Sequence, residues 1–103
     1  MVEINFDKLD RTLVLAELSC NHLQSFDIAV RTIEAMKKAG ADVVKVQNDN
    51  PDGGITIDCD NEYFQIGGGT LWDGKTLNKL YKETYTPWEW LPKLQKVAHD
   101  LDK

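Results

Sequence analysis

Hydrophobic residues follow the spacing of an α-helix between Ser25 and Ala39. The apolar positions in this stretch are Phe26, Ala29, Val30, Ile33 and Met36. Ser25 can cap the first turn, two lysines lie in the last turn, and Gly40 follows as a stop signal. The pattern therefore predicts a helix over residues 25–39.

Two short apolar runs flank this helix. Leu13–Ala16 precedes it, and a valine-rich stretch over residues 42–47 follows it. A strand, a helix and a second strand joined by short links form a parallel pair. We therefore expect an α/β arrangement with two buried parallel strands.

Alternating residues at the start of the chain predict a further strand. Val2, Ile4 and Phe6 are apolar and their neighbours are polar, which is typical of a half-buried strand. We expect residues 1–15 to form a capping hairpin that leads into the first core strand.

Residues 48–70 interrupt the α/β order. They begin with turn-forming residues, continue with an alternation from Ile55 to Asp60 and end near three consecutive glycines. We expect a small hairpin outside the main sheet. The glycines lack the spacing of a phosphate-binding loop and indicate a flexible turn.

Aromatic and apolar residues return after the glycines. Leu71 and Trp72 are expected to re-enter the core before a short helix near residues 75–85. The three tryptophans, which are Trp72, Trp88 and Trp90, are interpreted as core anchors.

A capping box marks the start of the last predicted helix. Thr86 is the expected N-cap, Pro87 occupies the first turn, and Glu89 follows three residues after the cap. The pattern predicts a helix over residues 86–101. Its expected buried stripe contains Trp88, Leu91, Leu94, Ala98 and Leu101.

Composition limits the function classes. The 103 residues, 42% of them hydrophobic, suffice for one small domain. A net charge of -5 without a basic stripe argues against a nucleic-acid partner. Neither a membrane-spanning run nor a signal peptide is apparent, so we expect a cytoplasmic protein without membrane contact. Cys20 and Cys59 are expected to be reduced thiols.

Polar side chains at the ends of the two core strands are the candidate site. Glu17 lies within an apolar strand, where a carboxylate marks either a site or a buried ion pair. Asn21 and His22 follow that strand, and Lys45 and Gln47 leave the second one. Ligands of parallel α/β proteins bind at the carboxyl ends of strands, which favours a site.

Three stretches carry longer motifs. They are A-E-L-S-C-N-H at Ala16–His22, A-G-A-D-V-V-K-V-Q at Ala39–Gln47, and L-W-D-G-K-x-L-x-x-L-Y-x-x-x-Y-T-P-W-E-W at Leu71–Trp90. Together they resemble the N-terminal portion of the sialic acid synthase family, in its pseudaminic acid synthase branch. The resemblance implies the N-terminal portion of a (β/α)8 TIM barrel with a capping hairpin. On this basis residues 1–103 form one fragment of the barrel, which ends before the third barrel strand.

The resemblance also implies an activity. Members of the family are transferases that condense phosphoenolpyruvate with an N-acetylated amino sugar, releasing phosphate and giving a nonulosonic acid for surface glycans. They use a divalent metal, manganese or magnesium, and form homo-oligomers. The metal ligands of the parent enzyme would lie beyond Lys103, so we expect neither a metal site nor a cofactor in this chain.

Individual residues match family positions. Lys45 matches a lysine that faces phosphoenolpyruvate, Gln47 a sugar-contacting glutamine, and Glu17 a catalytic glutamate. Asn21 and His22 match a substrate-binding pair in the loop after the first strand. The alternatives are a lysine that snorkels from a strand edge, a polar strand end at Gln47, and a structural ion pair between Glu17 and Lys45.

Two other functions are compatible with the sequence. The chain can be a truncated, non-catalytic interaction module or an expressed fragment without activity. A different barrel enzyme that uses phosphoenolpyruvate is a further alternative. Two places also depart from the family pattern, namely Cys20 and the run Asn48-Asp49-Asn50.

Overall fold

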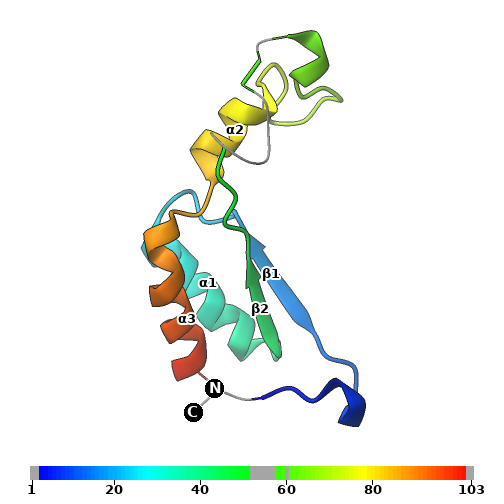
Figure 1. The fold of residues 1–103 in the computed structure, drawn as a ribbon, viewed down its shortest axis with the longest axis vertical. Helices are drawn as coiled ribbons and strands as arrows, with labels where there is room; N and C mark the ends of the chain where they lie inside the picture. The colour runs from blue at the N-terminus through cyan, green and yellow to red at the C-terminus, as the bar shows by residue number, and fades with distance from the viewer. Residues whose placement is uncertain (1–2, 52–57, 60, 102–103) are drawn as a thin grey trace.

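A two-stranded parallel sheet, covered on one face by two helices, forms the main part of the described structure (Figure 1). The computed structural model describes residues 3–51, 58, 59 and 61–101. Within them, β1 (Leu15–Ser19) pairs in parallel with β2 (Val43–Val46). Helix α1 (Phe26–Lys38) connects the strands, and α3 (Leu91–Asp100) packs beside α1. The predicted order of strand, helix and strand is confirmed.

The register of the sheet assigns its side chains to two faces. The paired positions are Leu15 with Val43, Ala16 with Val44, and Glu17 with Lys45. Because successive side chains of a strand point to opposite faces, Leu18 faces the helices while Leu15 and Glu17 face away. Leu18 is 1% exposed and Leu15 is 54% exposed. The face that carries Glu17 and Lys45 is therefore open in the described structure.

Helix α1 forms where the hydrophobic periodicity predicts it. The side chain of Ser25 accepts a hydrogen bond from the backbone N–H of Ile28 at 3.3 Å and so caps the first turn. Gly40 follows with a φ of 100°, a left-handed conformation that glycine adopts without strain. The helix buries Ala29 and Ile33 against the sheet.

The core lies between the two helices and the inner face of the sheet. Its fully buried members among the described residues are Leu18, Ala29, Ile33 and Leu94. Burial of a large aliphatic side chain contributes about 1.5–3 kcal/mol, and within the described residues only Leu18, Ile33 and Leu94 are buried core side chains of this kind. Within the described part of the chain, no helix has the length and apolar character needed to cross a membrane.

The predicted capping hairpin over residues 1–15 is wrong in the part that the structure describes. No strand forms there, and a short 3-10 helix, η1 (Phe6–Lys8), takes its place. The side chain of Asn5 accepts a hydrogen bond from the backbone N–H of Asp7 at 3.0 Å. This local bond competes with strand pairing and leaves Phe6 74% exposed.

An ion pair holds the segment before β1 against the start of β2. The guanidinium of Arg11 donates to both carboxylate oxygens of Asp42, which lies just before β2. Oδ2 of Asp42 also accepts a hydrogen bond from the backbone N–H of Val14 at 2.9 Å. The bond from Arg11, followed by that from Val14, holds the pKa of the Asp42 carboxyl well below its usual range. These contacts close the amino end of the sheet.

The segment after β2 extends away from the sheet (Figure 1). In its described part a 3-10 helix, η2 (Glu62–Phe64), is followed by α2 (Leu77–Thr84). One antiparallel bridge between them joins Gln65 to Thr76. The alternating part of the hairpin expected within residues 48–70 lies largely outside the described residues.

Helix α2 confirms the short helix predicted near residues 75–85, but the chain before it does not re-enter the core. Leu71 is 95% exposed and Trp72 is 47% exposed, so that prediction is wrong. The carboxylate of Asp73 accepts a hydrogen bond from the backbone N–H of Gly69 at 2.9 Å. The resulting tight turn is local and leaves the intervening apolar side chains in solvent.

The last helix begins later than the capping box predicts. A 3-10 turn, η3 (Trp88–Trp90), precedes α3, and neither element has a side-chain cap. Thr86, the expected N-cap of a helix over residues 86–101, is buried with its hydroxyl engaged elsewhere. Trp88 is 57% exposed and does not join the buried stripe. Trp90 does anchor the core, since its ring meets Phe26 edge-on at 5.6 Å between centroids.

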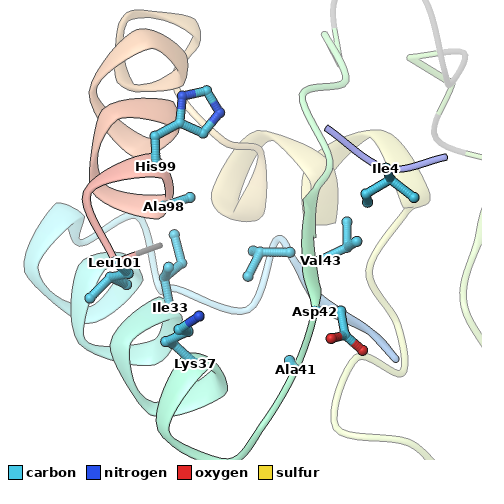
Figure 2. A pocket seen from close by; sticks show the side chains of 10 residues that line it. Ile4, Ile33, Lys37, Ala41, Asp42, Val43, Ala98, His99 and Leu101 are labelled. Atoms are coloured by element: carbon cyan, nitrogen blue, oxygen red, sulfur yellow. The ribbon is translucent and has the colours of Figure 1, made fainter. Parts of the chain in front are cut away.

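A cavity of about 250 Å³ lies between α1, α3 and the amino end of β2 (Figure 2). Ile33 and Ala98 line it from the helices, Asp42 and Val43 from the strand, and Ile4 from the N-terminal segment. In parallel α/β proteins the ligands bind at the opposite, carboxyl ends of the strands. We therefore interpret this cavity as a gap in the packing.

Candidate functional site

Glu17 and Lys45 meet on the open face of the sheet. They occupy paired positions of β1 and β2, and Nζ of Lys45 donates to Oε1 of Glu17 at 3.1 Å. Their side chains are 42% and 51% exposed, so the pair is not the buried ion pair that an apolar strand suggests. Both charged groups remain accessible from the open face.

Gln47 is held by Ser19 at the carboxyl ends of the two strands. The hydroxyl of Ser19 donates to Oε1 of Gln47, and the backbone N–H of Gln47 donates to the carbonyl oxygen of Ser19 at 3.3 Å. Ser19 has a φ of 54°, and the register of the sheet shifts between Glu17 and Ser19. This irregularity brings the Ser19 side chain to Gln47, a contact that strand periodicity does not predict.

His22 lies apart from the open face, inside the protein. Its side chain is 0% exposed, and Nδ1 accepts a hydrogen bond from the backbone N–H of Gln24 at 3.0 Å. Nε2 lies 2.8 Å from Oγ1 of Thr86, so the neutral ring carries its proton on Nε2. Burial lowers the pKa of His22 and favours this neutral form. The ring also meets Trp90 edge-on, with 5.2 Å between centroids.

This placement corrects the role expected for His22. Both ring nitrogens are satisfied within the protein, so the ring has no nitrogen left for a substrate. Asn21, its expected companion, is exposed, and its backbone N–H donates to the carbonyl oxygen of Leu18 at 3.0 Å. The pair therefore separates into a structural histidine and an accessible asparagine.

Thr86 and Cys20 complete the surroundings of Gln47. The hydroxyl of Thr86 points to the carbonyl oxygen of Ser19 at 3.5 Å, and Sγ of Cys20 donates to the carbonyl oxygen of Gln47 at 3.7 Å. Burial raises the pKa of the Cys20 thiol, although its contact with Thr86 opposes this shift. The sequence around Thr86 matches a helix cap and therefore does not indicate this contact, and the shift in register at Ser19 has no signal in the sequence.

The arrangement combines an accessible ammonium, a carboxylate and an amide at one end of the sheet. An ammonium at a strand end suits an anion, while the carboxylate and the amide suit hydroxyl or acylamino groups. Among the described residues, no group of three or more His, Cys, Asp and Glu side chains could hold a metal ion. The side chains of Glu17, Lys45 and Gln47 can bind polar or charged ligand groups, and the carboxylate can transfer a proton.

Comparison with known proteins shows the family to which the chain belongs. Residues 32–102 match the NeuB family. The chain is 42% identical over 96 residues to a pseudaminic acid synthase of Campylobacter jejuni, covering 93% of this chain and 27% of that relative. It is 40% identical over 89 residues to a pseudaminic acid synthase of Helicobacter pylori, covering 86% of this chain and 26% of that relative. The chain thus spans about a quarter of the length of these relatives, and it belongs to the NeuB family.

Proposed function

We propose that this chain is the N-terminal part of a pseudaminic or sialic acid synthase, and that β1 and β2 are the first two strands of its (β/α)8 barrel. The open face of the sheet, with Glu17 and Lys45, would then face the barrel interior. The observation that carries the proposal is this pair, placed next to Gln47 in a NeuB family chain. Active sites of such barrels lie at the carboxyl ends of the strands.

The proposed reaction joins phosphoenolpyruvate to the open-chain form of an N-acetylated amino sugar. C3 of phosphoenolpyruvate attacks the aldehyde carbon C1, and the aldehyde oxygen takes up a proton. Water adds to the cationic C2 that results and loses its two protons, of which one offsets the proton taken up by the aldehyde oxygen and the other leaves with phosphate. The bond between C2 and the phosphate oxygen breaks, and C2 becomes a ketone. The products are a nonulosonic acid and inorganic phosphate, so atoms and charge balance without an oxidant or reductant.

Each residue of the pair has a proposed part in this reaction. The ammonium of Lys45 binds the carboxylate or phosphate of phosphoenolpyruvate by charge-assisted hydrogen bonds. Glu17, 3.1 Å from that ammonium, orients it and takes the proposed part of a proton-transfer group at the reacting carbonyl. Gln47 and the exposed Asn21 contact the sugar. These are the expected site residues, with His22 now in a structural role.

The divalent metal that the family resemblance implies does not fit the residues described here, because they contain no cluster that could hold it. We propose that manganese or magnesium binds elsewhere in the whole synthase, and we assign it no step in this chain. We also propose that the whole synthase is a cytoplasmic homo-oligomer. These proposals extend the resemblance to the parts of the relatives that this chain does not cover.

A chimera tests the proposed function. The matching segment of the Campylobacter jejuni relative is replaced by this chain, with which it shares 42% identity. Purified chimera is assayed with phosphoenolpyruvate, manganese and a 6-deoxy diacetamido sugar for phosphate and for the condensed product. We expect stoichiometric formation of both. A folded chimera that makes neither product would overturn the proposal.

Two substitutions in the chimera test the site. Lys45→Ala should abolish most of the activity, since it removes the proposed anion-binding group. Lys38→Ala is the matched control, because Lys38 is exposed at the end of α1 and away from the open face. Equal activity of both variants would contradict the assignment of Lys45.

A further inference from the structure

We propose that Thr86 is a positioning residue which, together with His22, fixes Ser19 so that Gln47 presents N–H donors to the ligand. The inference rests on the proposed function and deepens it, because it names the kind of ligand atom that the site recognises. That atom is an acceptor oxygen of the sugar, either the carbonyl oxygen of an N-acyl group or a hydroxyl oxygen.

A chain of hydrogen bonds with a fixed direction links His22, Thr86 and Ser19. Nδ1 of His22 is an acceptor, because the backbone N–H of Gln24 donates to it, so Nε2 must carry the proton. Nε2 donates to Oγ1 of Thr86 at 2.8 Å, which leaves the hydroxyl proton of Thr86 directed at the carbonyl oxygen of Ser19, 3.5 Å away. His22 and Thr86 are both 0% exposed, so water does not compete for these bonds.

This hydrogen-bond chain ends at Ser19 and holds the Ser19 backbone in place. Ser19 has a left-handed backbone, with φ of 54°, at the shift in register of β1. Such a conformation is uncommon for a residue other than glycine and needs support from its surroundings. The carbonyl oxygen of Ser19 receives bonds from Thr86 and from the backbone N–H of Gln47. Thr86 therefore supports the residue whose hydroxyl contacts the Gln47 side chain.

The orientation of the Gln47 side-chain amide is set by Ser19. Because the hydroxyl of Ser19 donates to Oε1, the amide is held with its carbonyl oxygen occupied. Within the described part of the chain, Nε2 of Gln47 has no hydrogen-bond partner, and Gln47 is only partly buried. The free end of the side chain is thus a donor of two N–H groups. A ligand that binds it must supply an oxygen lone pair.

Nuclear magnetic resonance on the folded chimera, with substrates left out, tests the positioning independently of catalysis. The ¹⁵N shifts of His22 report the tautomer, and the side-chain amide of Gln47 reports its hydrogen bonding. We expect Nε2–H on His22 and a Gln47 amide distinct from those of exposed glutamines. Thr86→Val should move the Gln47 amide toward the exposed position, and Thr86→Ser should keep it in place.

Thr84→Val is the matched control. The hydroxyl of Thr84 donates to the carbonyl oxygen of Leu80 in α2 at 3.1 Å and takes no part in the chain. It should leave both His22 and Gln47 unchanged. If Thr86→Val does not fold, Ser19→Gly removes the last hydroxyl while suiting the positive φ, and should release Gln47 with the His22 tautomer intact. A Gln47 amide unaffected by either variant would overturn the positioning role.

Kinetics of the chimera test the polarity. Gln47→Glu replaces the two N–H donors by acceptors and should raise KM for the sugar by about two- to tenfold. KM for phosphoenolpyruvate should stay constant. Thr86→Val should also raise KM for the sugar, whereas Thr86→Ser should leave KM for the sugar at the value of the unsubstituted chimera. An unchanged sugar KM in Gln47→Glu would show that Gln47 does not act as a donor.

An analogue sugar with a free amine in place of the acylamino group identifies the oxygen. If the effect of Gln47→Glu disappears with this analogue, the partner is the N-acyl carbonyl oxygen, and if it persists, the partner is a hydroxyl oxygen. Both results support a donor at Gln47. If the chimera is inactive but Thr86→Val still moves the Gln47 amide signal, the result would count against the proposed function alone.

Discussion

Glu17 of β1 and Lys45 of β2 stand directly opposite each other in the parallel sheet, with 3.1 Å between Oε1 and Nζ. An ion pair exposed to this degree contributes little to stability, about 0–1 kcal/mol. Its neighbours on the open face include Leu15, which is 54% exposed. Stability is therefore a weak reason for this pair, which leaves room for the ligand-binding role that we propose for Lys45.

The first prediction separates the roles of Lys45 and Gln47. In the chimera, Lys45→Ala should raise KM for phosphoenolpyruvate, whereas Gln47→Ala should raise KM for the sugar. A hydrogen bond to a charged group is worth roughly 1.5–3 kcal/mol, which corresponds to about a ten- to hundredfold change for Lys45. Steady-state kinetics with each substrate varied in turn measures the two constants. Equal effects of both substitutions on both substrates would refute this division.

The second prediction concerns acid and the clamp between Arg11 and Asp42. The pKa of Asp42 is depressed in the folded chain, so its contribution to stability is present above the ordinary aspartate pKa of about 4. That contribution is lost as the pH falls below about 4, because the unfolded chain binds the proton first. Asp42→Asn should therefore lower the urea midpoint at pH 6, and by less at pH 3.

Asp27→Asn is the control for the clamp. Asp27 pairs with Arg31 at 3.6 Å on the surface of α1, and both side chains are more than 70% exposed. Its substitution should change the midpoint little at either pH. A larger effect of Asp27→Asn than of Asp42→Asn would show that the clamp does not hold the amino end of the sheet.

The third prediction follows from the burial of His22. Burial lowers its pKa in the folded chain, so as the pH falls the unfolded chain takes up a proton first. The free energy of unfolding should be constant above about pH 6.5 and should decrease below it. Urea unfolding of a His99→Gln variant between pH 7.5 and 5.5 isolates His22, since the sequence contains only these two histidines. A free energy that rises over this interval would contradict a buried neutral ring.

Local patterns predicted the parts of the fold that depend on neighbours in sequence. The helix from Ser25 forms as expected because its periodicity, cap and stop signal agree. Glu17 and Lys45 were identified as candidates from strand polarity, and parallel register then places them together. The resemblance to the NeuB family, read from the motifs, is confirmed by the comparisons.

Long-range contacts were the parts that local patterns could not predict. Thr86 has the sequence signature of an N-cap. Its hydroxyl is instead hydrogen-bonded to the buried ring of His22, 64 positions earlier. Trp88 has the spacing of a buried stripe, but its indole N–H instead donates to the carbonyl oxygen of Asn48 at 2.7 Å, leaving the ring exposed. The left-handed backbone of Ser19 has no signal in the sequence. Each of these residues makes a tertiary hydrogen bond that local sequence patterns do not indicate.

The last prediction is that the 103-residue chain by itself self-associates. Its described core has four buried hydrophobic side chains, and Leu15 on the open face and Val14 just before β1 are each 54% exposed. Ordering about 100 residues costs on the order of 100 kcal/mol of conformational entropy, which a small core offsets with difficulty. Two copies that pack their open faces against each other would bury this surface. Sedimentation at several concentrations and near-ultraviolet circular dichroism of the three tryptophans measure the outcome. A monodisperse monomer with a strong tertiary signal and a cooperative thermal transition would show that the chain stabilises its sheet without further strands, and would count against its place in a larger barrel.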